Sequence, residues 1–71
     1  MPNNKIHIEV GKRIQIIRNE KNMSQQDLAA KCNFEKSNMS RLEAGRVNAT
    51  ISTLEKVSAA LDIKIHELFK F

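Results

Sequence analysis

The sequence predicts an all-α fold of five short helices. Helix-breaking residues are scarce: the 71 residues include two glycines and one proline, whereas Ala, Leu, Glu, Lys, Gln and Arg are plentiful. Apolar residues recur with the period of a helix. Residues that favour helix ends separate these periodic stretches at short intervals. A chain of this length has space for one hydrophobic core, so residues 1–71 are expected to form a single domain.

The first helix is expected over about 8–22, after a flexible polar tail at 1–5. Its apolar stripe consists of Ile6, Val10, Ile14 and Ile17, spaced as on one face of a helix. Gly11 lies inside this stretch and lowers helix propensity by about 1 kcal/mol relative to Ala. The start of this helix is therefore expected to fray.

Two very short helices are expected next, over about 25–31 and 36–44. Ser24 can cap the free N–H groups of the first, and Asp27 lies in its first turn, where a negative charge is favourable. Gly45 ends the second, because glycine best accepts the left-handed conformation that follows a helix.

The tripeptide Asn33-Phe34-Glu35 joins these two helices through a tight turn. Asn33 can adopt the positive φ that such a turn needs. The residues expected to form the shared core of the two helices are Leu28, Ala29, Cys32, Met39 and Leu42. The small side chain of Ala29 allows the helices to approach closely.

A fourth helix is expected after the loop GRVNAT, capped by Thr50 or Ser52, and Ser52 with Glu55 has the spacing of a capping box. Its apolar face is predicted to comprise Leu54, Val57, Ala60 and Leu61. Asp62 is expected in the turn conformation. A last helical turn or two, lined by Ile65, Leu68 and Phe69, forms the fifth helix.

The helix over 36–44 carries a compact polar face. At about 100° per residue, Lys36, Ser37, Ser40 and Arg41 fall within an arc of about 140° opposite its apolar stripe. On an arbitrary helix these side chains would be a solvated face. Two short helices joined by a tight turn are, however, typical of helix-turn-helix DNA readers, whose second helix enters a major groove about 12 Å wide. The net charge of +4 also favours a polyanionic partner.

Four motifs carry a resemblance to a known family: Q-x-x-L-A at 25–29, M-S-R-L-E-x-G at 39–45, N-x-T at 48–50 and LEKVSAALDIKIHELF at 54–69. With these motifs, residues 8–69 resemble the phage repressor and Cro family of helix-turn-helix regulators, and in size the restriction-modification controller proteins. The resemblance implies a five-helix, lambda-repressor-like fold. It also implies a transcriptional regulator that binds an inverted-repeat operator in double-stranded DNA as a homodimer, and represses or in some contexts activates a promoter.

The resemblance also implies roles for individual residues. The base-contacting positions are Lys36, Ser37 and Arg41, flanked by Asn38 and Ser40. The phosphate-contacting positions are Gln25, Arg46 and Asn48, and Gln25 also buttresses the reading helix. Arg13 and Ser24 are further expected phosphate contacts. Arg18 and Glu43 match a partly buried ion pair. Asn33 stands where the family usually has a turn glycine, and Glu35 where it often has a capping Ser or Thr.

Apolar side chains near the C-terminal end predict a homodimer through the fourth and fifth helices. The residues concerned are Leu61, Ile65, Leu68, Phe69 and Phe71. They are more apolar surface than a single helical turn buries alone, and a helix-turn-helix monomer usually gains affinity by pairing two half-sites. In the alternative interpretation, these side chains close the core of a monomer.

Other classes of function find little support in the sequence. His7 and His66 lie far apart, no Cys or His cluster has metal-ligand spacing, and no catalytic arrangement stands out. We therefore expect no enzyme, cofactor, metal or small-molecule substrate. The lone Cys32 fits a small buried residue in a reducing cytoplasm, and neither a membrane span nor a signal peptide is recognisable. The main alternative is a protein-interaction module, such as the antitoxin of a toxin–antitoxin pair.

Overall fold

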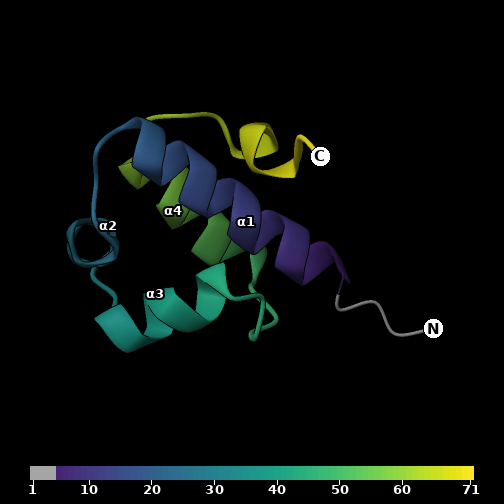
Figure 1. Ribbon diagram of the computed structural model, residues 1–71, viewed down its shortest axis with the longest axis horizontal. Helices are drawn as coiled ribbons and strands as arrows, with labels where there is room; N and C mark the ends of the chain where they lie inside the picture. The colour runs from purple at the N-terminus through teal and green to yellow at the C-terminus, as the bar shows by residue number, and fades with distance from the viewer. Residues whose placement is uncertain (1–4) are drawn as a thin grey trace.

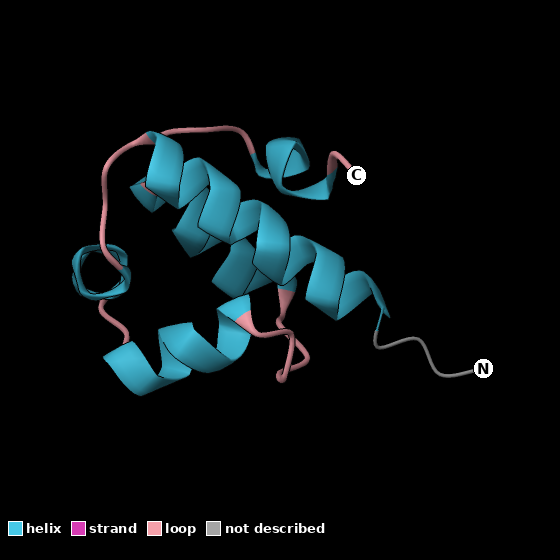
Figure 2. Cartoon of the chain, in the orientation of Figure 1, coloured by secondary structure: helices cyan, strands magenta, loops and turns pink. Residues whose placement is uncertain are grey.

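The long helix α1 (Lys5–Glu20) runs across the middle of the molecule, with α3 (Lys36–Glu43) on one side and the C-terminal turn on the other (Figure 1). The computed structural model describes residues 5–71, which are all-helical with no strand (Figure 2). Its elements are α1 (Lys5–Glu20), α2 (Gln25–Cys32), α3 (Lys36–Glu43), α4 (Ile51–Ala60) and the 3-10 helix η1 (Ile65–Phe69). α1 contacts α3 and η1, while α4 contacts α2 and η1.

The fifth element differs from the expected α-helix. The backbone N–H of Glu67 donates to the carbonyl of Lys64 at 3.0 Å, three residues back, which is the 3-10 pattern. Lys64 begins the element without a side-chain cap. Five residues are too few to repay the cost of starting an α-helix, so the segment forms the tighter turn instead.

α1 begins earlier than predicted and is helical through Gly11. Lys5, the last residue of the expected tail, is already helical, and the rest of that tail lies outside the described residues. Gly11 is buried, and a Cβ built on it would lie 2.4 Å from the carbonyl oxygen of Glu43. The glycine thus lets the backbones of α1 and α3 touch. This packing offsets the propensity cost on which the expectation of fraying rested.

The turn between α2 and α3 has the predicted chemistry. Asn33 is left-handed at φ 60° and closes α2, and the N–H of Phe34 donates to the carbonyl of Ala29 at 2.8 Å. Glu35 is extended at the N-cap of α3, and its side chain makes no capping hydrogen bond. α3 therefore starts without a side-chain cap, as its sequence indicates.

Thr50, not Ser52, caps α4. The hydroxyl of Thr50 accepts a hydrogen bond from the backbone N–H of Thr53 at 3.1 Å, whereas Ser52 lies within the first turn. Ser52 and Glu55 therefore do not form the capping box that their spacing predicted. After α4 the chain reverses at Asp62, which takes the predicted left-handed conformation at φ 58°.

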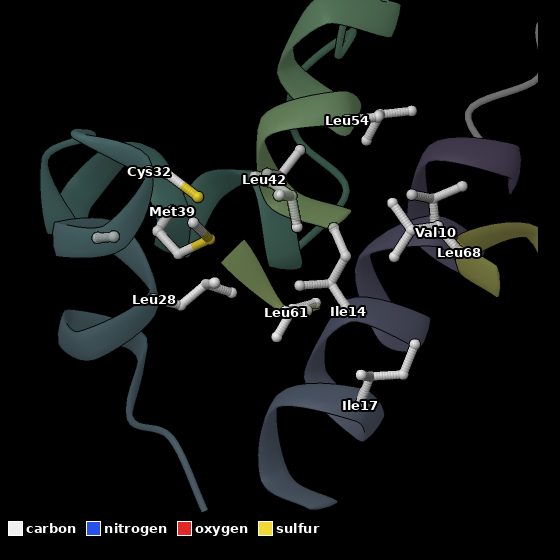
Figure 3. Packing of buried hydrophobic residues seen from close by; sticks show 12 residues of the cluster. Val10, Ile14, Ile17, Leu28, Cys32, Met39, Leu42, Leu54, Leu61 and Leu68 are labelled. Carbon is white, nitrogen blue, oxygen red and sulfur yellow. The ribbon is translucent and has the colours of Figure 1, made fainter. Parts of the chain in front are cut away.

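The core joins all five elements (Figure 3). Its buried apolar residues are Val10, Ile14, Ile17, Leu28, Ala29, Cys32, Met39, Leu42, Leu54, Val57, Leu61 and Leu68. Leu61 and Leu68 are 0 % exposed. Their expected place in a dimer interface is thus corrected: both are used inside the monomer, because the turn at Asp62 folds η1 back onto α1 and α4.

Candidate nucleic-acid interface

The exposed side of α3 gathers the five residues expected to contact bases. Its buried side consists of Met39, Leu42 and Glu43. The side chains that remain exposed are Lys36, Ser37, Asn38, Ser40 and Arg41. At 1.5 Å per residue, the eight residues of α3 span about 12 Å. The helix thus presents a short face of two cations and three hydrogen-bonding groups.

Arg41 is already oriented within this face. One of its guanidinium N–H groups donates to the side-chain oxygen of Asn38 at 3.4 Å. The spacing is i, i+3, at which side chains on one helix are neighbours, so the sequence carried a signal for this contact. Asn38 therefore lies beside the Arg41 guanidinium group.

The start of α2 forms one flank of the interface. Ser24 and Asp27 make a reciprocal capping box: the Ser24 hydroxyl accepts from the N–H of Asp27 at 3.0 Å, and the N–H of Ser24 donates to the Asp27 carboxylate at 3.1 Å. The bond from the Ser24 backbone holds the pKa of Asp27 below its ordinary value of 3.8. The Ser24 hydroxyl accepts in this cap and keeps its own O–H to donate. The expected phosphate contact of Ser24 stays a prediction, beside that of the half-buried Gln25.

The loop after α3 forms the other flank. Gly45 ends the helix at φ 74° and packs against Ile8 of α1, where a Cβ would lie 2.6 Å from the Ile8 Cα. Arg46 and Asn48 follow on this loop, and both are exposed. A groove of about 250 Å³ separates the loop from α3, with an apolar floor that includes Phe34. The residues that line this groove come from successive elements, so the periodicity within any one helix did not indicate it.

A buried ion pair ties the interface to α1. Nε of Arg18 lies 2.7 Å from Oε2 of Glu43, and its Nη2 donates to Oε1 at 3.0 Å. Nη1 of the same arginine donates to the carbonyl of Met23 at 2.8 Å. The pair implied by the family resemblance is thus present. One side chain that sequence reasoning did not connect to it, Gln25, also donates to Oε1 of Glu43 at 3.0 Å.

Arg13 is not brought to this interface. Its Nε donates to the backbone carbonyl of Glu67 at 2.8 Å, and its Nη2 lies 3.6 Å from the Glu67 carboxylate. These contacts hold η1 against α1, on the side of α1 opposite α3 in Figure 1. In this structure Arg13 therefore has a structural role, and its phosphate contact stays a prediction that these contacts do not support.

Two features are absent from residues 5–71. No group of three His, Cys, Asp or Glu side chains is placed to hold a metal ion. No helix in this part of the chain has the length and apolar character needed to cross a membrane.

Known proteins with related sequences and folds include control proteins and transcriptional regulators by name. Control protein C.MunI from Mycoplasma sp is 37% identical over 67 residues, covering 93% of this chain and 90% of its own length. The crystal structure of the restriction-modification controller protein C.AhdI from Aeromonas hydrophila superposes with a TM-score of 0.85 at 32% identity, covering 87% of this chain and 94% of that one.

A third similar structure contains nucleic acid. SinR, described as the master regulator for biofilm formation, was solved in complex with DNA and matches with a TM-score of 0.78 at 42% identity, covering 86% of this chain and 98% of that one. Other relatives are longer, and the chain spans 39% of one and 54% of another. The family model of the Cro/C1-type HTH DNA-binding domain matches residues 13–71. The chain thus belongs to the family of Cro/C1-type helix-turn-helix DNA-binding domains.

Proposed function

We propose that this protein is a transcriptional regulator that recognises a specific DNA sequence by inserting α3 into the major groove. The observation that carries the proposal is the exposed face of α3, whose polar side chains cover one side of a helix about 12 Å long. Gln25 lies on one flank of this face, and Arg46 and Asn48 lie on the other. A small controller of this kind fits the control and controller proteins that the chain resembles.

The side chains on α3 indicate what they would read. Arginine binds guanine best, because its planar fork matches O6 and N7, and lysine also prefers these acceptors. Ser37 discriminates little between bases. We therefore expect at least one G in each half-site, contacted by Arg41, with Lys36 as the second candidate. We expect Arg46 and Asn48 to contact phosphates, because both are exposed on the loop after α3, and phosphate contacts fix orientation without selecting sequence.

An unbiased selection from random DNA, with sequencing of the bound molecules, tests the proposal. The expected result is an enriched inverted repeat with half-site centres about one helical turn apart. No enrichment over random DNA would contradict sequence-specific recognition. It would favour the alternative of a protein-interaction module, such as an antitoxin, whose DNA binding is secondary.

The second part of the proposal is that the protein acts as a homodimer. Phe69 is 38% exposed and Phe71 61%, and both are large apolar side chains. Phe69 lines a hollow of about 160 Å³ together with Ile6 and Ile51, and Phe71 lines a neighbouring hollow that Ile6 shares. We call Ile6, Ile51, Phe69 and Phe71 the apolar patch.

The apolar patch replaces part of the interface expected from the sequence. Leu61 and Leu68 are buried in the monomer, and Ile65 is half-buried against the core. Ile6 and Ile51, which sequence reasoning did not assign to the interface, are 48% and 69% exposed. A contiguous apolar surface of this kind is typical of a protein-protein contact, and a two-fold axis through it would pair two copies of α3.

A further inference from the structure

The carboxylate of Glu43 is the meeting point of three helices. Its side chain is 0% exposed, although it ends the helix proposed to read DNA. Arg18 of α1 occupies Oε2 through Nε at 2.7 Å and reaches Oε1 through Nη2 at 3.0 Å. Oε1 also accepts a hydrogen bond from Nε2 of Gln25, the first residue of α2, at 3.0 Å. A single buried charge therefore touches one side chain from each neighbouring helix.

The chemistry of this contact fixes the orientation of the Gln25 amide. A glutamine amide has a donor end and an acceptor end that are hard to tell apart by shape. An ionised carboxylate only accepts, so the nitrogen of Gln25 must face Glu43. This uses one of the two N–H bonds on Nε2. The second N–H and the carbonyl oxygen remain for another partner.

Arg18, and not Gln25, supplies the positive charge that compensates the Glu43 carboxylate. A buried carboxylate with no cation nearby would be costly, and Arg18 compensates it through two hydrogen bonds. Gln25 therefore supplies a third, neutral hydrogen bond and stays half-buried at the start of α2. Its position next to the N-cap Ser24 puts it among the backbone N–H groups that open the helix.

We propose that Glu43 is a positioning residue for DNA binding: its buried carboxylate holds the Gln25 amide so that the second N–H meets a DNA phosphate. The inference rests on the proposed function. Glu43 lies two residues after Arg41 on α3. Glu43 would therefore fix the position of the phosphate contact at the start of α2 relative to the base-reading face of α3. We expect Glu43 to hold the Gln25 N–H donor in place before DNA binds, so that the side chain loses little conformational freedom on binding.

The free protein provides the first test, without any mutation. We expect the side-chain amide protons of Gln25, followed by nuclear magnetic resonance, to exchange more slowly and move less than those of Gln26. Gln26 is the matched control, because it is the exposed neighbour of the same residue type. Equal mobility of the two amides would overturn the proposal. This measurement needs no DNA, so it stands even if the protein proves to bind none, which would refute the proposed function instead.

The second test locates the phosphate. Phosphates of the selected DNA sequence are replaced one at a time by uncharged methylphosphonates, and affinity is measured for the wild type, Glu43→Gln and Gln25→Met. We expect one position in each half-site to weaken wild-type binding about tenfold, the effect of losing one hydrogen bond to a charged group. That position should become silent in both variants.

Gln25→Met is included so that the test remains decisive if Glu43→Gln does not fold. Glu43→Gln faces the donors of Arg18 with an amide and can destabilise the fold, whereas Gln25→Met keeps the ion pair and the length of the side chain. If both variants fold and each stays sensitive at the same phosphate, the proposal is wrong. If Glu43→Gln does not fold, the slow exchange of the Gln25 amide together with a silent position in Gln25→Met supports it, and a Gln25→Met variant that keeps full sensitivity overturns it.

Discussion

Gly11 and Glu43 are in backbone contact across the α1–α3 crossing, where a Cβ on the glycine would lie 2.4 Å from the glutamate carbonyl oxygen. Two helical turns further along α1, Arg18 binds the side chain of the same Glu43. α1 therefore holds the end of α3 by close backbone packing and by one buried charge. The angle of the proposed reading helix depends on α1 as well as on α2.

Substituting Gly11 with alanine should destabilise the protein, although alanine is the better helix former. The added methyl group meets backbone atoms of α3, which cannot rotate away, and such overpacking typically costs about 1–3 kcal/mol. The gain in helix propensity, about 1 kcal/mol, offsets only part of this. Chemical denaturation measures the change, with the exposed Lys12→Ala as the control near zero. A Gly11→Ala variant more stable than the wild type would contradict the packing argument.

Arg41→Ala and Arg46→Ala should affect DNA binding differently. Loss of Arg41 is expected to relax the preference at one base pair in each half-site by about 1–3 kcal/mol. Loss of Arg46 should weaken binding to all sequences alike and reduce the salt dependence by about one phosphate contact. Selection experiments and affinity measurements at several salt concentrations separate the two effects. An unchanged base preference after Arg41→Ala would remove this residue from base reading.

Glu35→Ser should improve both stability and DNA binding. Glu35 is the N-cap of α3 but provides no side-chain hydrogen bond, whereas a serine cap typically adds about 1 kcal/mol. Removing its negative charge next to the proposed interface should also reduce repulsion of phosphates. Glu35→Gln is the matched control, because it removes the charge without providing a good cap. We expect it to raise DNA affinity at low salt while leaving thermal stability nearly unchanged.

The free energy of unfolding should fall as the solution becomes acidic. Lys70 lowers the pKa of Glu67 below 4.5 through a side-chain hydrogen bond, and the Ser24 backbone lowers that of Asp27 below 3.8. For both groups the unfolded chain binds protons more readily, so their stabilising effect is complete above these ordinary values and is lost as the pH falls through the folded ones. Denaturation curves from neutral pH down to about pH 3 should therefore be less pH-dependent in Asp27→Asn.

Phe71→Ser should weaken self-association. Phe71 is the most exposed aromatic side chain of the apolar patch, and truncating a central aromatic contact typically weakens an interface about tenfold or more. Sedimentation equilibrium at micromolar concentration measures the dimer dissociation constant. Ile16→Ser is the control, because Ile16 is 48% exposed on α1 but lies outside the patch. A wild-type protein that stays monomeric would refute the dimer itself.

Local sequence signals predicted most of the helices and the reading face. The capping box at Ser24, the left-handed turns at Asn33 and Asp62, and the end of α3 at Gly45 all depend on residues close together in the chain. The exposed residues of α3 could be predicted for the same reason, because the helical period alone determines which side chains share a face. The fifth helix was the exception, since a five-residue segment gives too short a pattern to distinguish an α-helix from a 3-10 turn.

The sequence by itself thus determined the helix order, the turn and the side chains presented by α3. Only the tertiary structure decided that Gly11 packs on Glu43, that Gln25 binds the same glutamate, and that Arg13 serves η1. Helical periodicity relates residues within one helix, but it does not specify which helices meet or at what distance. These contacts join residues 18 to 54 positions apart, and they follow from how separate apolar faces fill one core.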